Sequence, residues 1–212
     1  MNLKLSLVIP AKDKNDKKLA ELLRSIEAQD FPKDEMETLV ITEGTSESAK
    51  AIGIRQAKGE VIGILASDNE MTYPTFLSTM LRDFPVVDAT TTRFYFYKKD
   101  DDILNRYFAL IGGNDPLSLY MGKNDREPFW NRDNDVSPEE WRRYIGKHEC
   151  TIGDNGFFIK KNLIEDTDLE NYYHIDNAIE AVLSGDGNIN KIHTDIWHKT
   201  GGNIFKFFAK RY

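Results

Sequence analysis

The chain has 212 residues, 40% hydrophobic and 30% charged, which is enough for a packed core and excludes a wholly disordered protein. Its net charge of -7 disfavours the basic face that nucleic-acid binding requires, so we expect no nucleic-acid partner. The single cysteine, Cys150, excludes an intrachain disulfide framework and favours a reducing compartment, and we expect a cytoplasmic protein.

Apolar runs alternate with amphipathic segments from the first residues onward. Residues 3–9 alternate and then become continuously apolar, which predicts a strand that ends at Pro10. Apolar residues at helical spacing predict a helix over 18–29, and residues 37–42 predict a second strand. A strand, a helix and a strand in this order form a βαβ unit, whose two strands are parallel.

The same order continues toward the middle of the chain. A helix is expected over 46–58, capped by Ser46 or Ser48 and ended by a glycine. Apart from Glu60, residues 59–65 are apolar or glycine and rich in β-branched types, which predicts a third, buried strand. A polar turn over 66–70 follows it, at the sheet edge where open α/β sheets bind ligands.

The second half of the chain has a weaker pattern. Residues 112–135 are rich in Gly, Asn, Asp and Pro, and the segment is too long for a simple connection. It is expected to be either a lid that covers the acceptor or a disordered insertion. The other expected elements are a helix from 73–74, a strand over 88–97, a helix over 103–111, a strand over 151–159, a helix through 178–182 and a strand over 189–196.

Four short motifs stand at the ends of the predicted strands and helices. They are VIPA at 8–11, LVITEGTS at 39–46, AKGEV at 57–61 and LASDN at 65–69. Their order and spacing resemble the inverting family 2 glycosyltransferases of GT-A fold. The resemblance is strongest over the first ninety residues and continues loosely to 153–158 and 174–176.

This resemblance implies an α/β protein of GT-A fold, Rossmann-like, with a mostly parallel sheet flanked by helices. It implies one domain over 1–212, in which residues 1–97 bind a nucleotide-sugar of UDP- or GDP-sugar type and residues 98–212 bind the acceptor. The implied activity is an inverting, hexosyltransferase-like transfer of the sugar to a hydroxyl acceptor.

Two positions depart from the family pattern. The family places two aspartates one residue apart after the third strand, where this chain has Ala66 and Asp68. It also has an acidic pair after the second strand, where this chain has residues 42–44 as TEG. A non-catalytic nucleotide-sugar-binding or scaffold domain is therefore one alternative. A nucleotidyltransferase is another, although the loop at 10–14 has lysines and lacks the glycines expected of it.

The polar turn after the third strand predicts a cation site. A divalent cation stabilises the charge of a leaving diphosphate, and Mg²⁺ needs only one or two protein carboxylates in addition to substrate phosphates. We expect Mg²⁺ or Mn²⁺ on Asp68, with Glu70 assisting. The resemblance implies that a late histidine, His198, reaches the same cation or the diphosphate.

An inverting transfer needs a general base that takes the acceptor proton. The resemblance implies Asp176, at the start of a helix, although an aspartate there is also an ordinary N-cap. Asp154 is the alternative base because the glycine-rich bend at 153–156 would bring it to the cleft.

Further polar residues are candidates for substrate contacts. The acceptor candidates are Asp115 and Arg126, in the long loop. The donor candidates are Pro10, Ala11, Asp13, Glu43, Lys50 and Asp68.

The C-terminal residues 204–212 are aromatic and basic. This composition is typical of a segment that rests on anionic lipid, so peripheral contact with the inner face of the membrane and a glycan or lipid-linked acceptor are expected. A final helix packed on the core is the alternative.

Overall fold

The computed structural model describes residues 3–113, 115–133, 152–164, 172–184, 187–200 and Phe207. Its strands are β1 (Leu5–Pro10), β2 (Met36–Ile41), β3 (Val61–Ile64), β4 (Asn69–Met71), β5 (Ala89–Tyr95), β6 (Phe157–Lys160) and β7 (Ile189–His198). Its α-helices are α1 (Lys17–Glu27), α2 (Ser46–Gln56), α3 (Phe76–Leu81), α4 (Ile103–Ile111), α5 (Pro116–Tyr120) and α7 (Ile175–Ser184).

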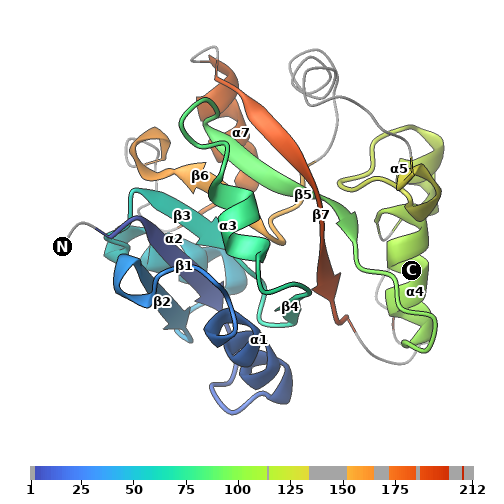
Figure 1. Ribbon diagram of the computed structural model, residues 1–212, viewed down its shortest axis with the longest axis horizontal. Coiled ribbons are helices and arrows are strands. Elements are labelled where there is room, and N and C mark those ends of the chain that lie inside the picture. Colours follow the sequence, from blue (N-terminus) through green and yellow to red (C-terminus); the bar gives the residue numbers. More distant parts are fainter. Residues whose placement is uncertain are drawn as a thin grey trace.

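The strands form a seven-stranded sheet in the order β2-β1-β3-β6-β5-β7-β4 (Figure 1). Strand β1 is parallel to β2 and β3, and β5 is parallel to β7. Strand β6 runs antiparallel to its neighbours β3 and β5, and β4 runs antiparallel to β7. All strands except β6 and β4 therefore point the same way, which confirms the predicted mostly parallel α/β sheet and brings the ends of β1, β2, β3 and β7 to one edge.

Both faces of the sheet are buried because helices cover each of them (Figure 1). Successive side chains of a strand point to opposite faces. Leu7 of β1 accordingly lies in the core formed with α1 and α3, whereas its neighbour Val8 lies in the core formed with α2 and α7. This double burial explains why β1, apart from Ser6, and β3 are made of apolar residues and glycine.

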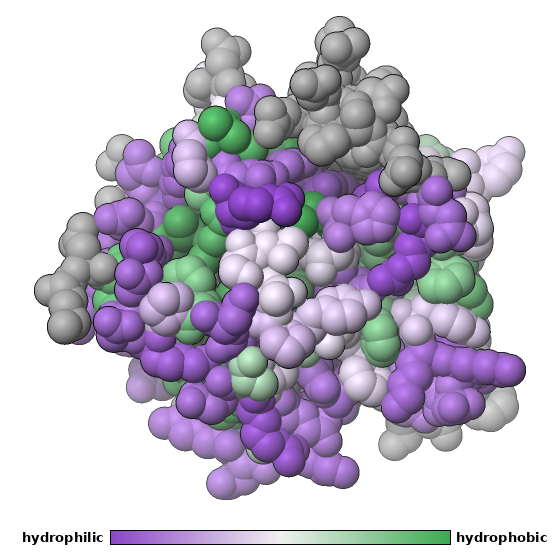
Figure 2. All heavy atoms as spheres, viewed as in Figure 1, coloured by the Kyte–Doolittle hydropathy of each residue, from purple (hydrophilic) through white to green (hydrophobic). Residues whose placement is uncertain are grey.

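Helix α1 has a single apolar stripe. Leu19, Leu22 and Ile26 are buried at helical spacing, and the carboxylate of Asp16 caps the helix by accepting the N–H of Lys18 (2.7 Å). The opposite side is polar, and Figure 2 shows a strongly hydrophilic surface over α1 at the bottom of the view.

Helix α2 packs closely against β1. A Cβ atom on Gly53 would lie 2.4 Å from a methyl group of Val8, so only glycine permits this approach. The cap is Thr45 and not Ser46 or Ser48 as predicted. Thr45 and Ser48 form a reciprocal capping box, because Gly44 (φ 77°) turns the chain so that the helix begins directly after Thr45.

Three segments differ from the predictions, and one of them is the strand expected over 151–159, which begins only at Phe157. The polar turn ends earlier than expected: Asn69 donates its N–H to the carbonyl of Ala66 (2.9 Å) and opens strand β4, which pairs with β7. The long loop contains α5 and a 3₁₀ turn at Phe129–Asn131. Short-range propensity missed β4 because the strand exists only through pairing with a distant strand.

Cys150 and nearly all of the segment 204–212 lie outside the described residues. The exception is Phe207, whose ring centroid lies 5.4 Å from that of Phe108. Among the described residues, none of the helices combines the length and apolar character needed to cross a bilayer.

Candidate functional site

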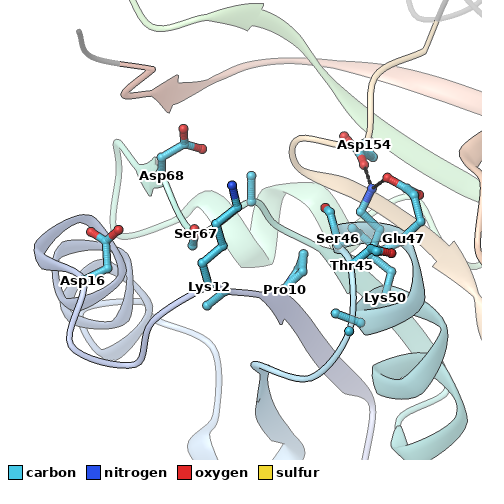
Figure 3. Close-up of a pocket in the computed structure, with 15 residues that line it drawn as sticks. Pro10, Lys12, Asp16, Thr45, Ser46, Glu47, Lys50, Ser67, Asp68 and Asp154 are labelled. Carbon is cyan, nitrogen blue, oxygen red and sulfur yellow. Dashed lines mark hydrogen bonds and ion pairs between the residues drawn. The ribbon is translucent and has the colours of Figure 1, made fainter.

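Two pockets adjoin each other at the edge where the parallel strands end. The first pocket has a volume of about 460 Å³ and is lined by the ends of β1 and β3 and by the β2–α2 turn (Figure 3). The second pocket, of about 310 Å³, is lined by residues of β5, α4, α5 and β7 and by the loop residues 113, 123–125 and 153–155. Asp154 belongs to the walls of both, so the two pockets meet at this carboxylate.

The loop after β1 forms one wall of the first pocket. Pro10 and Ala11 line it, and the N–H of Ala11 donates to the last residue of β2 (2.9 Å), which holds the wall in place. Asp16, the cap of α1, also lines the pocket. Asp13 does not line either pocket, because its carboxylate turns to the exposed N–H of Asn15 (2.9 Å).

The first turn of α2 forms a second wall. Gly44, Thr45, Ser46 and Glu47 line the pocket there (Figure 3). The first N–H groups of a helix have no partner within the helix, and the helix dipole places positive charge at this end. This wall is therefore suited to an anion such as a phosphate group. Glu43, predicted at this turn, is exposed and lines neither pocket.

Lys50 lies behind that turn and joins two carboxylates. Its Nζ donates to Glu47 (2.8 Å) and to Asp154, as the dashed lines in Figure 3 show. Burial would lower the pKa of Lys50, but the charges and hydrogen bonds of Asp154 and Glu47 outweigh burial and raise it. Lys50 is therefore protonated and positively charged on the wall of the first pocket.

Asp68 lies in the turn between β3 and β4, opposite α2. Its Oδ1 is 3.4 Å from Nε2 of His198, at the end of β7. Burial would raise the pKa of Asp68, but the hydrogen bond and charge of His198, with the charge of Lys18, outweigh burial and lower the pKa. Asp68 lines the first pocket and His198 the second, so this pair also stands where the pockets adjoin.

Glu70 does not join this pair. It follows Asn69 in β4, and strand alternation turns the two side chains to opposite sides. Asn69 is buried beneath the turn, whereas the carboxylate of Glu70 forms an ion pair with Lys199, which also pairs with Glu21 (2.8 Å). Glu70 lines neither of the two pockets.

The residues at the turn offer few ligands for a cation. Within the described ranges, no cluster of three or more His, Cys, Asp or Glu side chains has the geometry of a metal site. The donor set is one carboxylate oxygen, from Asp68, and one imidazole nitrogen, from His198. This set fits a weakly held divalent cation that takes its other ligands from water and substrate phosphates.

The second pocket combines aromatic and polar side chains. Phe108 and Tyr95 provide rings, and Asp125 provides a carboxylate. The hydroxyl of Tyr95 donates to Asp125 (2.8 Å), and burial together with the charge of Asp125 raises the pKa of Tyr95 far above its ordinary value. Tyr95 is therefore a neutral hydrogen-bond donor in this pocket.

A chain of amide hydrogen bonds ties the two pockets together. The Oδ1 of Asn69 accepts the N–H of Ala66 (2.8 Å), and its Nδ2 donates to the Oδ1 of Asn155 (3.2 Å). Asn155 in turn lies 3.5 Å from the hydroxyl of Tyr95. The backbone N–H of Ala66 is thus held by a neighbouring amide side chain.

Three predicted residues lie elsewhere. Arg126 is 1% exposed and donates to Thr92 (2.9 Å) and to the carbonyls of Asp125 (3.1 Å) and Asn155, a setting typical of a structural residue. Asp115 caps α5, accepting the N–H of Leu117 (2.8 Å), and lines neither pocket.

The third is Asp176, in the first turn of α7. Its side chain is 75% exposed, pairs with His174 (2.9 Å) and lines neither pocket. Its catalytic role, like the acceptor roles of Asp115 and Arg126, stays a prediction.

Several pocket residues were missed by sequence reasoning. Asp125, Asn155, Tyr95 and Phe108 come from four separate segments, and no local pattern groups them. Asp16 had a usable signal, because an aspartate directly before a helical apolar stripe is a typical N-cap and the N-terminus of a helix after β1 faces the pocket edge.

The fold defines the class to which this structure corresponds: it is the GT-A fold of nucleotide-sugar glycosyltransferases. No family model matches the sequence, and no curated protein matches it. The likeness therefore rests on the three-dimensional structure.

The similar solved structures include TarS residues 1–349 from S. aureus, with a TM-score of 0.57 and 15% identity over 91% of this chain and 59% of that one. TarS 1–349 in complex with UDP-GlcNAc gives a TM-score of 0.55 and 15% identity over 98% and 64%. The mannosyltransferase PcManGT from Pyrobaculum calidifontis, in complex with GDP-Man and Mn²⁺, gives 0.53 and 14% over 92% and 55%. The present chain thus spans less than two thirds of each of these chains.

Proposed function

We propose that the protein is a glycosyltransferase that moves a sugar from a nucleotide-sugar to a hydroxyl acceptor. The observation that carries this proposal is the meeting of two polar pockets at Asp154 and at the Asp68–His198 pair. One pocket has the features of an anion site, and the other has the aromatic and polar walls that suit a sugar. The complexes of similar structures with UDP-GlcNAc and with GDP-Man support a donor of this type.

In this proposal the donor lies in the first pocket. Its nucleoside rests against Pro10 and Ala11, and its diphosphate faces the first turn of α2 and Lys50. A divalent cation, Mg²⁺ or Mn²⁺, would be held by Asp68 and His198 and would stabilise the charge on the leaving diphosphate. The Mn²⁺ in the PcManGT complex supports the cation.

The acceptor lies in the second pocket, against Phe108 and Asp125. As its hydroxyl oxygen forms a bond to the anomeric carbon, the bond from that carbon to the phosphate oxygen breaks, and the electron pair leaves with the nucleoside diphosphate. The hydroxyl proton passes to a carboxylate. Asp154, on the walls of both pockets, is placed for this role, and one displacement of this kind inverts the anomeric configuration.

The experiment is calorimetry with UDP, GDP and their sugar conjugates, with and without Mn²⁺, followed by product analysis by NMR. Binding of one nucleotide class and transfer with an inverted anomeric centre are expected. Binding without turnover for any acceptor would favour the non-catalytic alternative that Ala66 raises. Failure to bind any of these nucleotides would reject the glycosyltransferase proposal.

We also propose that the acceptor is lipid-linked or near a membrane and that the protein works at the inner face of the membrane. The aromatic and basic composition of residues 204–212 supports this. Replacing Lys206, Lys210 and Arg211 by Glu should abolish binding to vesicles that contain anionic lipid. Unchanged binding would reject the membrane contact.

A further inference from the structure

We propose that Lys50 couples donor binding to the release of the base Asp154. In the free protein the Lys50 ammonium holds the Asp154 carboxylate. When the diphosphate enters the first pocket, the ammonium turns to it and frees Asp154 to accept the acceptor proton. This inference rests on the proposed function and adds an order of events to it.

The starting arrangement is visible in Figure 3, where Lys50 lies between Glu47 and Asp154. The Lys50 side chain is 7% exposed, whereas those of Glu47 and Asp154 are 32% and 30% exposed. The Lys50 ammonium is therefore largely shielded from water, and its charge is stabilised by these hydrogen bonds. The two carboxylates remain partly exposed in the pockets. Two of the three N–H donors of the ammonium bond to carboxylates.

The same geometry makes an exchange of partners feasible. Glu47 lies three residues before Lys50 on the same helix and moves with it, so this bond persists. Asp154 belongs to a distant segment, and its bond to Lys50 is the one that a phosphate oxygen would replace. The exchange replaces one charge-assisted hydrogen bond by another, so its net free energy is small. The entering diphosphate can therefore determine which partner the Lys50 ammonium takes.

The exchange changes what Asp154 can do. While Asp154 accepts a hydrogen bond from the ammonium, one of its carboxylate lone pairs is occupied, and the positive charge of Lys50 offsets part of its negative charge. After the exchange, the carboxylate is free on the wall of the second pocket, where the acceptor hydroxyl would lie. Asp154 is therefore free to take the acceptor proton only when the donor is bound.

A double-mutant cycle on nucleotide affinity tests the coupling without any turnover. We would measure UDP and GDP binding by calorimetry for wild type, Lys50→Met, Asp154→Asn and the double variant. Lys50→Met should weaken binding about tenfold, the value of a hydrogen bond to a charged group. Asp154→Asn should tighten binding about threefold, because the nucleotide no longer competes for Lys50, and this gain should vanish in the Lys50→Met background.

Asp16→Asn is the matched control. It removes a carboxylate from the wall of the same pocket without touching Lys50, and asparagine is an equally good helix cap. Any gain in nucleotide affinity from Asp16→Asn comes from the removal of one negative charge near the anionic ligand. This gain should therefore persist in the Lys50→Met background.

Two results would overturn the coupling but not the proposed function. In the first, Asp154→Asn weakens nucleotide binding as Lys50→Met does, which indicates a purely structural ion pair. In the second, Asp154→Asn raises the affinity equally in the wild-type and Lys50→Met backgrounds. If wild type binds neither nucleotide, the proposed function fails and the coupling falls with it. These outcomes are distinguishable because only the last one removes wild-type binding.

Discussion

The two pockets share one carboxylate but are built in different ways. The first pocket is lined mainly by the turns that follow β1, β2 and β3 and by the first turns of α2, with Asp154 as a more distant contribution. The second is lined by residues of β5, α4, α5 and β7 and by the loop residues 123–125 and 153–155, which are held by hydrogen bonds of Asn155 and Arg126. The first therefore needs only the correct strand order, whereas the second also needs an intact side-chain network.

The shared carboxylate gives the largest expected effect. Asp154→Asn should lower kcat by about 10²–10⁴-fold, the usual contribution of a general base, while nucleotide binding is kept. The measurement is steady-state transfer with saturating donor. Asp176→Asn is the control, because Asp176 lies outside both pockets. A loss of kcat in Asp176→Asn with an active Asp154→Asn would contradict this assignment and support Asp176 as the base.

The next prediction concerns the stability of the side-chain network that holds the second pocket. Arg126→Met should lower the free energy of unfolding by about 3 kcal/mol, because the buried hydroxyl of Thr92 and two partly buried carbonyls lose their donor at once. Thermal and urea unfolding measure this loss. Asp115→Ala, which removes an exposed cap of the short helix α5, should cost about 1 kcal/mol or less. Equal losses in the two variants would show that Arg126 does not hold the second pocket together.

The proposed cation site, the Asp68–His198 pair, lies where the two pockets adjoin, and its loss should change nucleotide binding. His198→Ala should weaken the Mn²⁺-dependent part of nucleotide affinity about tenfold, because one of two protein ligands is lost. Calorimetry of UDP and GDP with and without Mn²⁺ measures this change. Glu70→Gln is the control, since Glu70 pairs with Lys199 and faces away. A similar loss in Glu70→Gln would place the cation outside the Asp68–His198 pair.

The smallest effect concerns pH. The folded pKa of Asp68 is lowered, so its ionised form adds stability above the unfolded pKa of about 3.9, and this stability is lost as the pH falls through the folded pKa. Wild type should exceed Asp68→Asn in unfolding free energy by less than about 1 kcal/mol near neutral pH, and the difference should shrink below about pH 4. Urea unfolding across that range measures both curves. A difference that does not change with pH would show that the Asp68 charge is not involved.

Sequence patterns predicted the parts of the protein that depend on neighbours in the chain. The apolar residues of β1 and β3 and the stripe of α1 indicate burial directly, because a strand or helix must bury the face that its own residues make apolar. Parallel strand order then placed Pro10, Ala11, Lys50 and Asp68 at one edge, and these residues do line one pocket. Asp13 and Glu43 do not line this pocket, although they lie within two residues of Ala11 and Gly44, which do. Their side chains turn to solvent instead.

By itself, then, the sequence determined the α/β order of elements and the edge where a ligand would lie, since both follow from local periodicity. Tertiary structure alone decided that Asp154 meets Lys50, that His198 faces Asp68 and that Glu70 turns to Lys199. These pairs join residues 104, 130 and 129 positions apart (154 − 50, 198 − 68 and 199 − 70). Side-chain pairing over such separations depends on sheet register and on which face each strand turns inward, and no short-range pattern carries that information.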